Sequence, residues 1–229
     1  MVAPMDRRAV RARVAELALR HVRAGDPVGW FEELYRDARG DVEQIPWADL
    51  TPNPFLQAWL NDNPGLSGEA LVVGCGLGDD AEAVSAAGLA VTAFDVSPTS
   101  IVWCRERFPD SIVDYQVANL LAPPESWNKR FDLIIEIYTV QSLPVDVRFA
   151  ALDSLTSLLR HGGRLVLVTR ARDDDDEPSG PPWALSGAEL EQLLIGRMSL
   201  DRFEDFYDDE DPPERRFVAV FRKPRSLIV

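Results

Sequence analysis

The chain has 229 residues, of which 46% are hydrophobic and 27% are charged, and this suits one α/β domain with a modest extension. Its net charge of −14 disfavours a nucleic-acid substrate, because phosphate backbones repel an acidic surface, and no apolar run is long enough to cross a bilayer. Two cysteines, Cys75 and Cys104, do not indicate a disulfide framework. We therefore expect a cytoplasmic monomer or homodimer with no nucleic-acid or membrane partner.

The N-terminal segment, residues 1–65, is predicted to form a helical cap, or lid. Residues 5–23 carry apolar side chains at helical spacing. Residues 29–60 combine aromatic side chains with Pro46, Pro52 and Pro54, a pattern typical of short helices joined by tight turns. The aromatic residues of this segment are Trp30, Phe31, Tyr35, Trp47, Phe55 and Trp59.

Strand and helix patterns alternate in the second region, residues 66–229, which predicts a doubly wound α/β fold. The expected helices cover 79–87, 98–108, 145–159 and 187–195. The connection after residue 207 is too short for a helical crossover, so it implies an antiparallel step. The prediction is a seven-stranded, mostly parallel, Rossmann-like sheet whose last strand is antiparallel. The expected strands are 70–73, 90–94, 112–117, 131–137, 164–169, 200–207 and 216–222.

The strongest local motif is the sequence LVVGCGLGDDAE, which begins at Leu71. An apolar strand runs into Gly74, Gly76 and Gly78, where glycine lets the backbone turn sharply and approach a ligand. The next strand ends at Asp95, which follows Gly74 by 21 residues. An acidic residue at about this spacing hydrogen-bonds the ribose of a bound nucleotide in Rossmann-like folds.

The residues after the glycine loop indicate which nucleotide derivative binds. Asp79 and Asp80 stand at the start of the following helix, where they would repel a pyrophosphate. S-adenosylmethionine carries no phosphate and has a positive sulfonium, so the two aspartates favour it. They argue against the alternative of a nicotinamide-dependent oxidoreductase on the same sheet.

With these motifs in hand, the chain resembles class I S-adenosylmethionine-dependent methyltransferases. Within that class it is similar to the thiopurine S-methyltransferase branch, which also contains thiol and halide methyltransferases. The glycine loop and Asp95 are common to the class, whereas IPWADLTPNPFLQAWL (45–60) and GPPWALSGAEL (180–190) are more specific to the branch. The resemblance also rests on VANLL (117–121), FDLIIEIYTVQSLP (131–144) and LLRHGGRLVLV (158–168).

The resemblance implies a role for each candidate site residue. Gly74, Cys75, Gly76 and Gly78 form the loop that approaches the methionyl part of the cofactor, and Asp95 binds the ribose hydroxyls. Val96 and Ser97 flank the adenine, and Asn119 and Leu120 hold its edge, although most relatives have Asp at position 119. Trp47, from the N-terminal segment, folds over the cofactor. Glu136 lies beside the departing methyl group, and Tyr138 follows it on the substrate side.

The chemistry expected from these residues is methylation of a small molecule, with a thiol as the acceptor. A thiol supplies some thiolate near neutral pH and needs little help from the protein. Neither His21 nor His161 lies in a catalytic motif; we expect His21 to end a helix and His161 to lie in a turn. The sequence offers no metal site, because the acidic runs 173–177 and 208–214 lack the spacing of a calcium loop.

Two alternatives remain open at this point. Glu136 or Tyr138 would serve as the base in an O- or N-methyltransferase of a small metabolite. A non-catalytic relative that only binds the cofactor is the other alternative.

Overall fold

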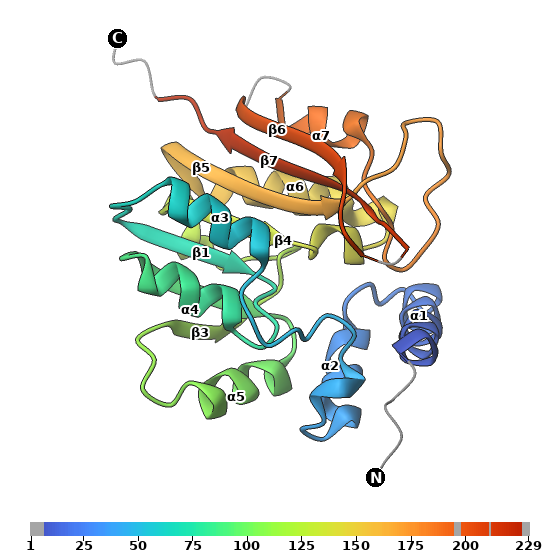
Figure 1. Ribbon diagram of the computed structural model, residues 1–229. Helices are drawn as coiled ribbons and strands as arrows, with labels where there is room; N and C mark the ends of the chain where they lie inside the picture. The colour runs from blue at the N-terminus through green and yellow to red at the C-terminus, as the bar shows by residue number, and fades with distance from the viewer. Residues whose placement is uncertain (1–6, 195–197, 211, 226–229) are drawn as a thin grey trace.

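The computed structural model describes residues 7–194, 198–210 and 212–225. Within these residues the chain forms a seven-stranded sheet with the strand order β3-β2-β1-β4-β5-β7-β6 (Figure 1). β7 is antiparallel to both of its neighbours, and the other strand pairs are parallel, which confirms the predicted fold class. The strands are β1 (Glu69–Val73), β2 (Ala90–Asp95), β3 (Asp114–Val117), β4 (Phe131–Ile137), β5 (Leu159–Arg170), β6 (Ser199–Tyr207) and β7 (Arg215–Arg222).

Helices cover both faces of the sheet, which explains why its central strands are nearly continuous apolar runs. α3 (Pro54–Asp62), α4 (Asp79–Ala86) and α5 (Pro98–Arg107) pack with one face. α6 (Val145–Leu158) and α7 (Gly187–Leu194) pack with the other. α4, α5, α6 and α7, the helices of the second region, begin at the predicted residues. α4, α5 and α6 end one residue earlier than predicted, and the predicted end of α7, residue 195, lies outside the described residues. No helix in the described ranges has both the length and the apolar character needed to cross a bilayer.

Two parts of the sheet differ from the prediction. β5 starts at Leu159, so the expected turn around His161 is wrong: this residue lies within the strand. The extra residues form a bulge in which Phe131 pairs with Leu159 and Leu133 with Arg164. β3 is shorter than expected because its pairing with β2 begins only at Asp114, and Ile112 is 85% exposed.

The N-terminal segment begins with α1 (Arg7–Arg23), α2 (Gly29–Ala38) and the short 3-10 helix η1 (Val42–Gln44). In Figure 1, α1 and α2 lie together beyond the edge of the sheet toward which the parallel strands point. Their buried side chains form an apolar cluster that also includes Leu77 of the glycine loop. α3 differs from them, since Leu56, Trp59 and Leu60 belong to the core on the sheet. Residues 5 and 6 of the first predicted helix lie outside the described residues.

His21 lies in the last turn of α1, near the helix end where it was predicted, and it has structural partners there. Its Nε2 lies 2.7 Å from Glu33 and its Nδ1 lies 3.2 Å from Asp26. The hydrogen bond with Glu33 contributes most to raising the pKa of the imidazole above its ordinary value. The ring therefore ties α1 to α2.

Candidate active site

A cavity of about 1010 Å³ lies at the carboxyl ends of the parallel strands, against the N-terminal segment. Its size is at the upper limit of the roughly 300–1,000 Å³ found for small-molecule sites. Gly78, Ser97 and Glu136, three of the twelve predicted site residues, are not among the residues that line it. The nine that do are Trp47, Gly74, Cys75, Gly76, Asp95, Val96, Asn119, Leu120 and Tyr138.

The order of the strands divides the cavity into two sides. The residues that follow β1, β2 and β3 line what we call the β1–β3 side, which includes Gly76, Asp95 and Asn119. The β4–β7 side is lined by Tyr138 after β4, Arg170 at the end of β5 and other residues nearby. Arg216 belongs to this side because β7 runs antiparallel, which brings the start of β7 beside the end of β5.

The glycine loop uses its glycines for two different purposes. Gly76 has a φ of +53°, and a Cβ at this position would meet only side-chain atoms of Tyr35 and Trp47, at 3.4 Å or more. Gly78 has a φ of +93°, and a Cβ there would lie 2.6 Å from the Tyr115 hydroxyl oxygen. Gly76 therefore gives the backbone access to the cavity, whereas Gly78 is required for packing against β3.

Cys75 lies in the same loop and lines the cavity. Its thiol contacts that of Cys104 on α5, and this contact and burial raise its pKa well above the usual range. Both cysteines are free thiols. We therefore assign the Cys75 side chain to loop packing.

Asp95 ends β2 with its side chain buried at the wall of the cavity. Its carboxylate accepts hydrogen bonds from the backbone N–H groups of Gly76, at 3.1 Å, and Ser97, at 2.9 Å. Burial raises its pKa to about 6. A carboxylate has about four acceptor sites, so Asp95 retains capacity for hydroxyl donors on a ligand.

Ser97 and Asn119 each accept a hydrogen bond from the backbone of the segment in which they lie. Ser97 caps α5, accepting a hydrogen bond from the N–H of Ser100 at 3.0 Å, and it is fully buried. The side-chain oxygen of Asn119 accepts from the N–H of Leu121 at 2.9 Å. That oxygen keeps one lone pair, and its amide group keeps its donors, for a ligand in the cavity.

The two aspartates after the glycine loop are not the pair of free charges that the sequence predicted. Asp79 forms two hydrogen bonds with the guanidinium of Arg107, at 2.7 and 2.8 Å. Asp80 accepts from the backbone N–H of Asn53 at 2.7 Å, and burial raises its pKa to about 6. The electrostatic argument against a pyrophosphate is therefore weaker than the sequence indicated, because Arg107 neutralises one of the two charges.

Aromatic residues of the N-terminal segment form the wall opposite the glycine loop. Trp47 donates from its indole N–H to the hydroxyl oxygen of Tyr35 at 2.9 Å, and Trp47 is 36% exposed. Trp30 and Phe31 stack with their ring centroids 3.7 Å apart, and both line the cavity.

Tyr138 lies just beyond β4 in a left-handed backbone conformation, with a φ of +62°. Such a conformation is costly for a residue other than glycine, and strain of this kind is common at functional sites. The guanidinium of Arg216 lies over the ring, 5.1 Å from its centroid, and the hydroxyl group hydrogen-bonds with the side chain of Asn53. Burial raises the pKa of Tyr138, so its hydroxyl is a donor at neutral pH.

Glu136 is fully buried and does not line the cavity. Its Oε1 accepts from the backbone N–H groups of Thr139 and Val140, both at 2.8 Å. Its Oε2 has no hydrogen-bond partner among the described residues, and burial raises its pKa to about 7. Glu136 thus holds the turn that presents Tyr138.

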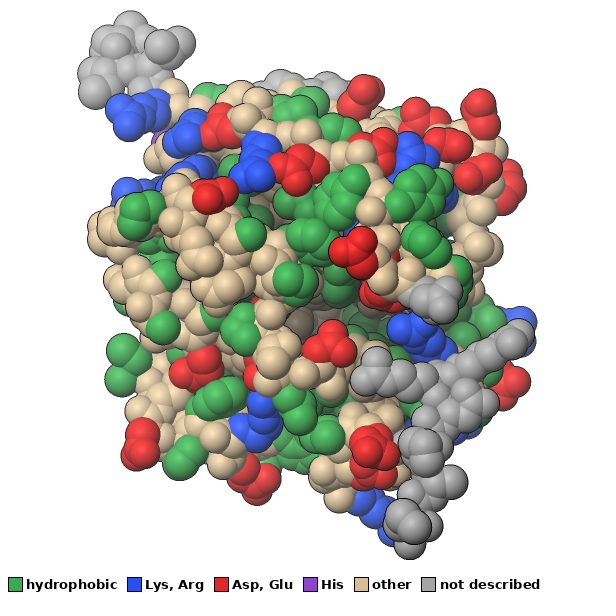
Figure 2. Space-filling model, viewed as in Figure 1, with side chains coloured by type: hydrophobic (Ala, Val, Ile, Leu, Met, Phe, Trp, Pro, Cys, Tyr) green, Lys and Arg blue, Asp and Glu red, His purple; other side chains and the backbone are tan. Residues whose placement is uncertain are grey.

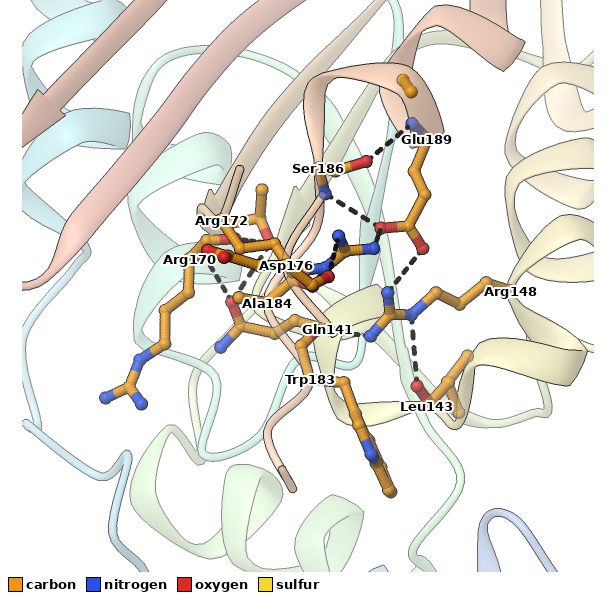
Figure 3. A network of polar contacts seen from close by, with 12 residues as sticks. Gln141, Leu143, Arg148, Arg170, Arg172, Asp176, Trp183, Ala184, Ser186 and Glu189 are labelled. Atoms are coloured by element: carbon orange, nitrogen blue, oxygen red, sulfur yellow. Dashed lines mark hydrogen bonds and ion pairs between the residues drawn. The ribbon is translucent and has the colours of Figure 1, made fainter. Parts of the chain in front are cut away.

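A polar network on the far side of this turn positions the segment that contains Pro181 and Pro182 (Figure 3). Arg148, whose side chain is 2% exposed, donates to Glu189 at 2.6 Å, and Arg172 donates to the other oxygen of Glu189 at 2.9 Å. Arg148 also donates to the backbone oxygen of Trp183. Because Trp183 directly follows Pro182, these contacts fix the position of the two prolines at the cavity.

Comparison with known proteins identifies the family of this chain. A family model described as thiopurine S-methyltransferase matches residues 36–228. The chain belongs to the thiopurine S-methyltransferase family. This confirms the resemblance predicted from the motifs, and with it S-adenosylmethionine as the cofactor.

Relatives of known name are consistent with this family. The chain is 28% identical over 153 residues to a probable thiol methyltransferase 2 of Arabidopsis thaliana. The aligned region covers 66% of each chain. It is 33% identical over 81 residues to a thiopurine S-methyltransferase of Vibrio atlanticus, which covers 35% of this chain and 37% of the relative. The chain thus spans about two thirds of the first relative's length and just over a third of the second's.

Solved structures share the fold of this family member. The N-methyltransferase NodS of Bradyrhizobium japonicum, in complex with S-adenosylhomocysteine, has a TM-score of 0.65 at 21% identity and covers 84% of this chain and 97% of its own. A 1,6-didemethyltoxoflavin-N1-methyltransferase of Burkholderia thailandensis has a TM-score of 0.66 at 19% identity, with coverage of 98% and 92%.

The structure of this family member adds site residues that the sequence did not indicate. Glu32 on α2 accepts hydrogen bonds from the hydroxyl groups of Ser97, at 2.7 Å, and Thr99, at 2.8 Å. Arg170 and Arg216 line the β4–β7 side. No local sequence signal marks these residues, because each meets its partners through the tertiary fold.

Proposed function

We propose that this protein transfers a methyl group from S-adenosylmethionine to the sulfur of a small-molecule thiol. The observation that carries this proposal is the chemistry of the β4–β7 side. Among the described residues that line the cavity there is no histidine, and Glu136 is not one of them. An acceptor that ionises by itself near neutral pH, such as a thiol with a pKa of about 8.5, needs no base from the protein.

The residues of the β1–β3 side fit the cofactor. We expect Asp95 to bind the ribose hydroxyls, Gly76 to allow close approach of the methionyl part, and Val96 and Asn119 to contact the adenine. Trp47 would cover the ligand from the N-terminal segment, which we propose to be a cap. When bound, S-adenosylmethionine supplies an electrophilic methyl group: the acceptor sulfur bonds to the methyl carbon as the bond between that carbon and the sulfonium breaks, which leaves S-adenosylhomocysteine.

The chain's own contribution is to orient the acceptor and to exclude water. Tyr138 and the prolines Pro181 and Pro182 line the β4–β7 side, where an acceptor would lie in line with the methyl group. Orientation of this kind lowers the barrier without acid–base chemistry, and loss of water makes a thiolate more reactive. Tyr138 keeps its proton and can donate a hydrogen bond to the acceptor.

The experiment that tests the proposal is a screen of acceptors for S-adenosylhomocysteine formation. Thiols, phenols, amines and halide ions are each incubated with the full chain and S-adenosylmethionine. We expect turnover with aromatic thiols and little with phenols and amines. Turnover of a phenol or an amine in preference to every thiol would contradict S-methylation and favour the O- or N-methyltransferase alternative.

Partners and location follow from the same reasoning. The net charge of −14 supports a small-molecule acceptor over nucleic acid. Figure 2 shows basic side chains interspersed with acidic ones on one face, without a continuous basic surface. The free thiols of Cys75 and Cys104 support a reducing, cytoplasmic location, with the chain acting as a monomer or homodimer.

A further inference from the structure

Arg170 is held firmly at the β4–β7 side of the cavity. Its backbone N–H donates to the side-chain oxygen of Gln141 at 2.6 Å, and its backbone oxygen accepts from the N–H of Leu185 at 3.0 Å. These bonds fix the start of the Arg170 side chain relative to the turn that carries Tyr138. The side chain itself lines the cavity and is 22% exposed.

The guanidinium of Arg170 makes no hydrogen bond within the described residues. It forms an ion pair with Glu214 at 3.6 Å, a distance too long for a hydrogen bond. Figure 3 shows the side chain pointing away from the network of Arg148, Arg172 and Glu189. Five N–H donors of a largely buried guanidinium are therefore left for a ligand or for water.

Neighbouring arginines are different, because short hydrogen-bonded contacts already pair their charges. Arg172, two residues further on, lies 2.9 Å from Glu189. Arg215 lies within 2.7 Å of Asp205 and Asp173. Arg216, the other cation from the sheet at the cavity, lies 2.6 Å from both Asp208 and Glu210. Arg170 differs from these three because, among the described residues, its guanidinium has only a long ion pair with Glu214 and no hydrogen bond. On the sheet side of the cavity, an anionic group would thus find its available hydrogen-bond donors in Arg170.

The position of Arg170 in the sheet indicates whether it would contact the cofactor or the methyl acceptor. β5 is two strands away from β1, which is about 10 Å at the usual spacing of roughly 4.8 Å between strands. Asp95 and Asn119 lie on the opposite side of β1, after β2 and β3. Arg170 is therefore remote from the residues expected to bind the cofactor, and it faces the part of the acceptor that lies beyond the reacting sulfur.

We infer that the acceptor carries a carboxylate in addition to its thiol, and that Arg170 is the specificity-determining residue that binds this carboxylate. The planar guanidinium matches two carboxylate oxygens with two parallel N–H donors, a geometry that a single thiolate sulfur does not offer. The charge of Glu210 is partly offset by Arg216, at 2.6 Å, and by Arg11, at 4.0 Å, which reduces its repulsion of the carboxylate. The inference rests on the proposed thiol methylation and narrows its substrate class to mercapto-carboxylic acids.

The test compares two acceptors that differ in charge but hardly in shape, 4-mercaptobenzoate and 4-mercaptobenzamide. We expect the native protein to prefer the carboxylate by about 10-fold or more in kcat/KM, the range of a charge-assisted hydrogen bond. Arg170→Gln should reduce this preference to near unity, and Arg170→Lys should keep part of it. Arg215→Gln removes the same charge from an arginine outside the cavity and should keep the full preference.

Binding measurements separate this inference from the proposed function. The methylated products, 4-(methylthio)benzoate and 4-(methylthio)benzamide, are titrated by calorimetry into each protein saturated with S-adenosylhomocysteine. Tighter binding of the benzoate that depends on Arg170 supports the inference even if no thiol is turned over, in which case only the proposed activity fails. Equal binding and turnover of the two compounds, or a preference that survives Arg170→Gln, overturns the inference and leaves thiol methylation intact.

Discussion

Glu32 on α2 accepts a hydrogen bond of 2.7 Å from the hydroxyl group of Ser97, which lies 65 residues further along the chain at the start of α5. The same carboxylate accepts from the hydroxyl of Thr99 at 2.8 Å and from its backbone N–H at 3.1 Å. These hydrogen bonds lower the pKa of Glu32 against the opposing effect of burial, which is the larger single influence. The contact joins the N-terminal segment to the helix that follows Asp95.

The first prediction follows from this contact. Glu32→Gln should loosen the N-terminal segment and weaken S-adenosylhomocysteine binding about 10-fold, because hydrogen bonds to a charged group contribute roughly 1.5–3 kcal/mol. Calorimetry measures the affinity, and hydrogen exchange of residues 29–47 measures the loosening. Glu43→Gln, at an exposed position of the same segment, is the matched control. Native affinity with unchanged exchange in Glu32→Gln would show that this contact does not hold the cap.

The second prediction concerns the pH dependence of cofactor binding. Ribose hydroxyls donate to the ionised form of Asp95, so a proton on this group opposes binding. Since the pKa of Asp95 is about 6, affinity for S-adenosylhomocysteine should be constant above that pH and fall by up to 10-fold per unit below it. Asp95→Asn should bind about 10- to 100-fold more weakly at neutral pH and lose the pH dependence.

Asp80 is the necessary control for this experiment, because its pKa is also about 6 and it lines the same cavity. Asp80→Asn should retain the pH dependence, and so should the exposed variant Asp110→Asn. A pH dependence that vanishes in Asp80→Asn and persists in Asp95→Asn would show that Asp80 is the titrating group, which would contradict the role of Asp95.

The third prediction concerns stability and Glu136. Glu136→Ala leaves the buried N–H groups of Thr139 and Val140 without their acceptor, which should cost about 2–4 kcal/mol in the free energy of unfolding. Glu136→Gln keeps an oxygen acceptor and should cost less. Urea unfolding of the three proteins measures the difference. Equal stabilities would contradict the role of Glu136 in holding this turn.

The pH dependence of stability gives an independent check of Glu136. Burial raises its pKa from an ordinary value of 4.5 to about 7, so the unfolded chain ionises first as the pH rises. Ionisation therefore favours unfolding, and this group should reduce stability by up to about 3 kcal/mol between pH 4.5 and 7. Glu136→Gln should not show this decrease in stability between pH 4.5 and 7. A parallel pH profile for the native protein and the variant would disagree with this assignment.

The fourth prediction concerns the methyl acceptor. If the thiolate forms without a base from the protein, the rate at subsaturating thiol should rise with pH up to the pKa of the thiol itself. Across a series of aromatic and aliphatic thiols, the midpoint of this rise should follow the acceptor. Tyr138→Phe should change the rate but leave each midpoint in place. A midpoint that is the same for all acceptors and disappears in Tyr138→Phe would indicate that the enzyme supplies the base.

The β1–β3 side was predictable from the sequence because its information is local. Parallel strands that follow one another in the chain bring Gly76 and Asp95 to the same edge of the sheet, so a motif and a spacing were sufficient. The strands and helices of the second region were also encoded locally, in apolar runs and helical periodicity. The bulge around His161 was not, since two glycines in a row are equally typical of a turn and of an irregular strand.

The β4–β7 side depended on the tertiary structure. β4 is apolar on both faces, so the sequence did not indicate which face Glu136 occupies, and in the fold it does not line the cavity. The sequence does not distinguish one arginine from another. Only long-range contacts show that Arg216 is hydrogen-bonded to two carboxylates, whereas Arg170 has a single long ion pair with Glu214. Local sequence patterns thus determined the sheet and the cofactor loop. The acceptor side depended on the tertiary structure, because its charged and polar side chains pair with residues that are distant in the sequence.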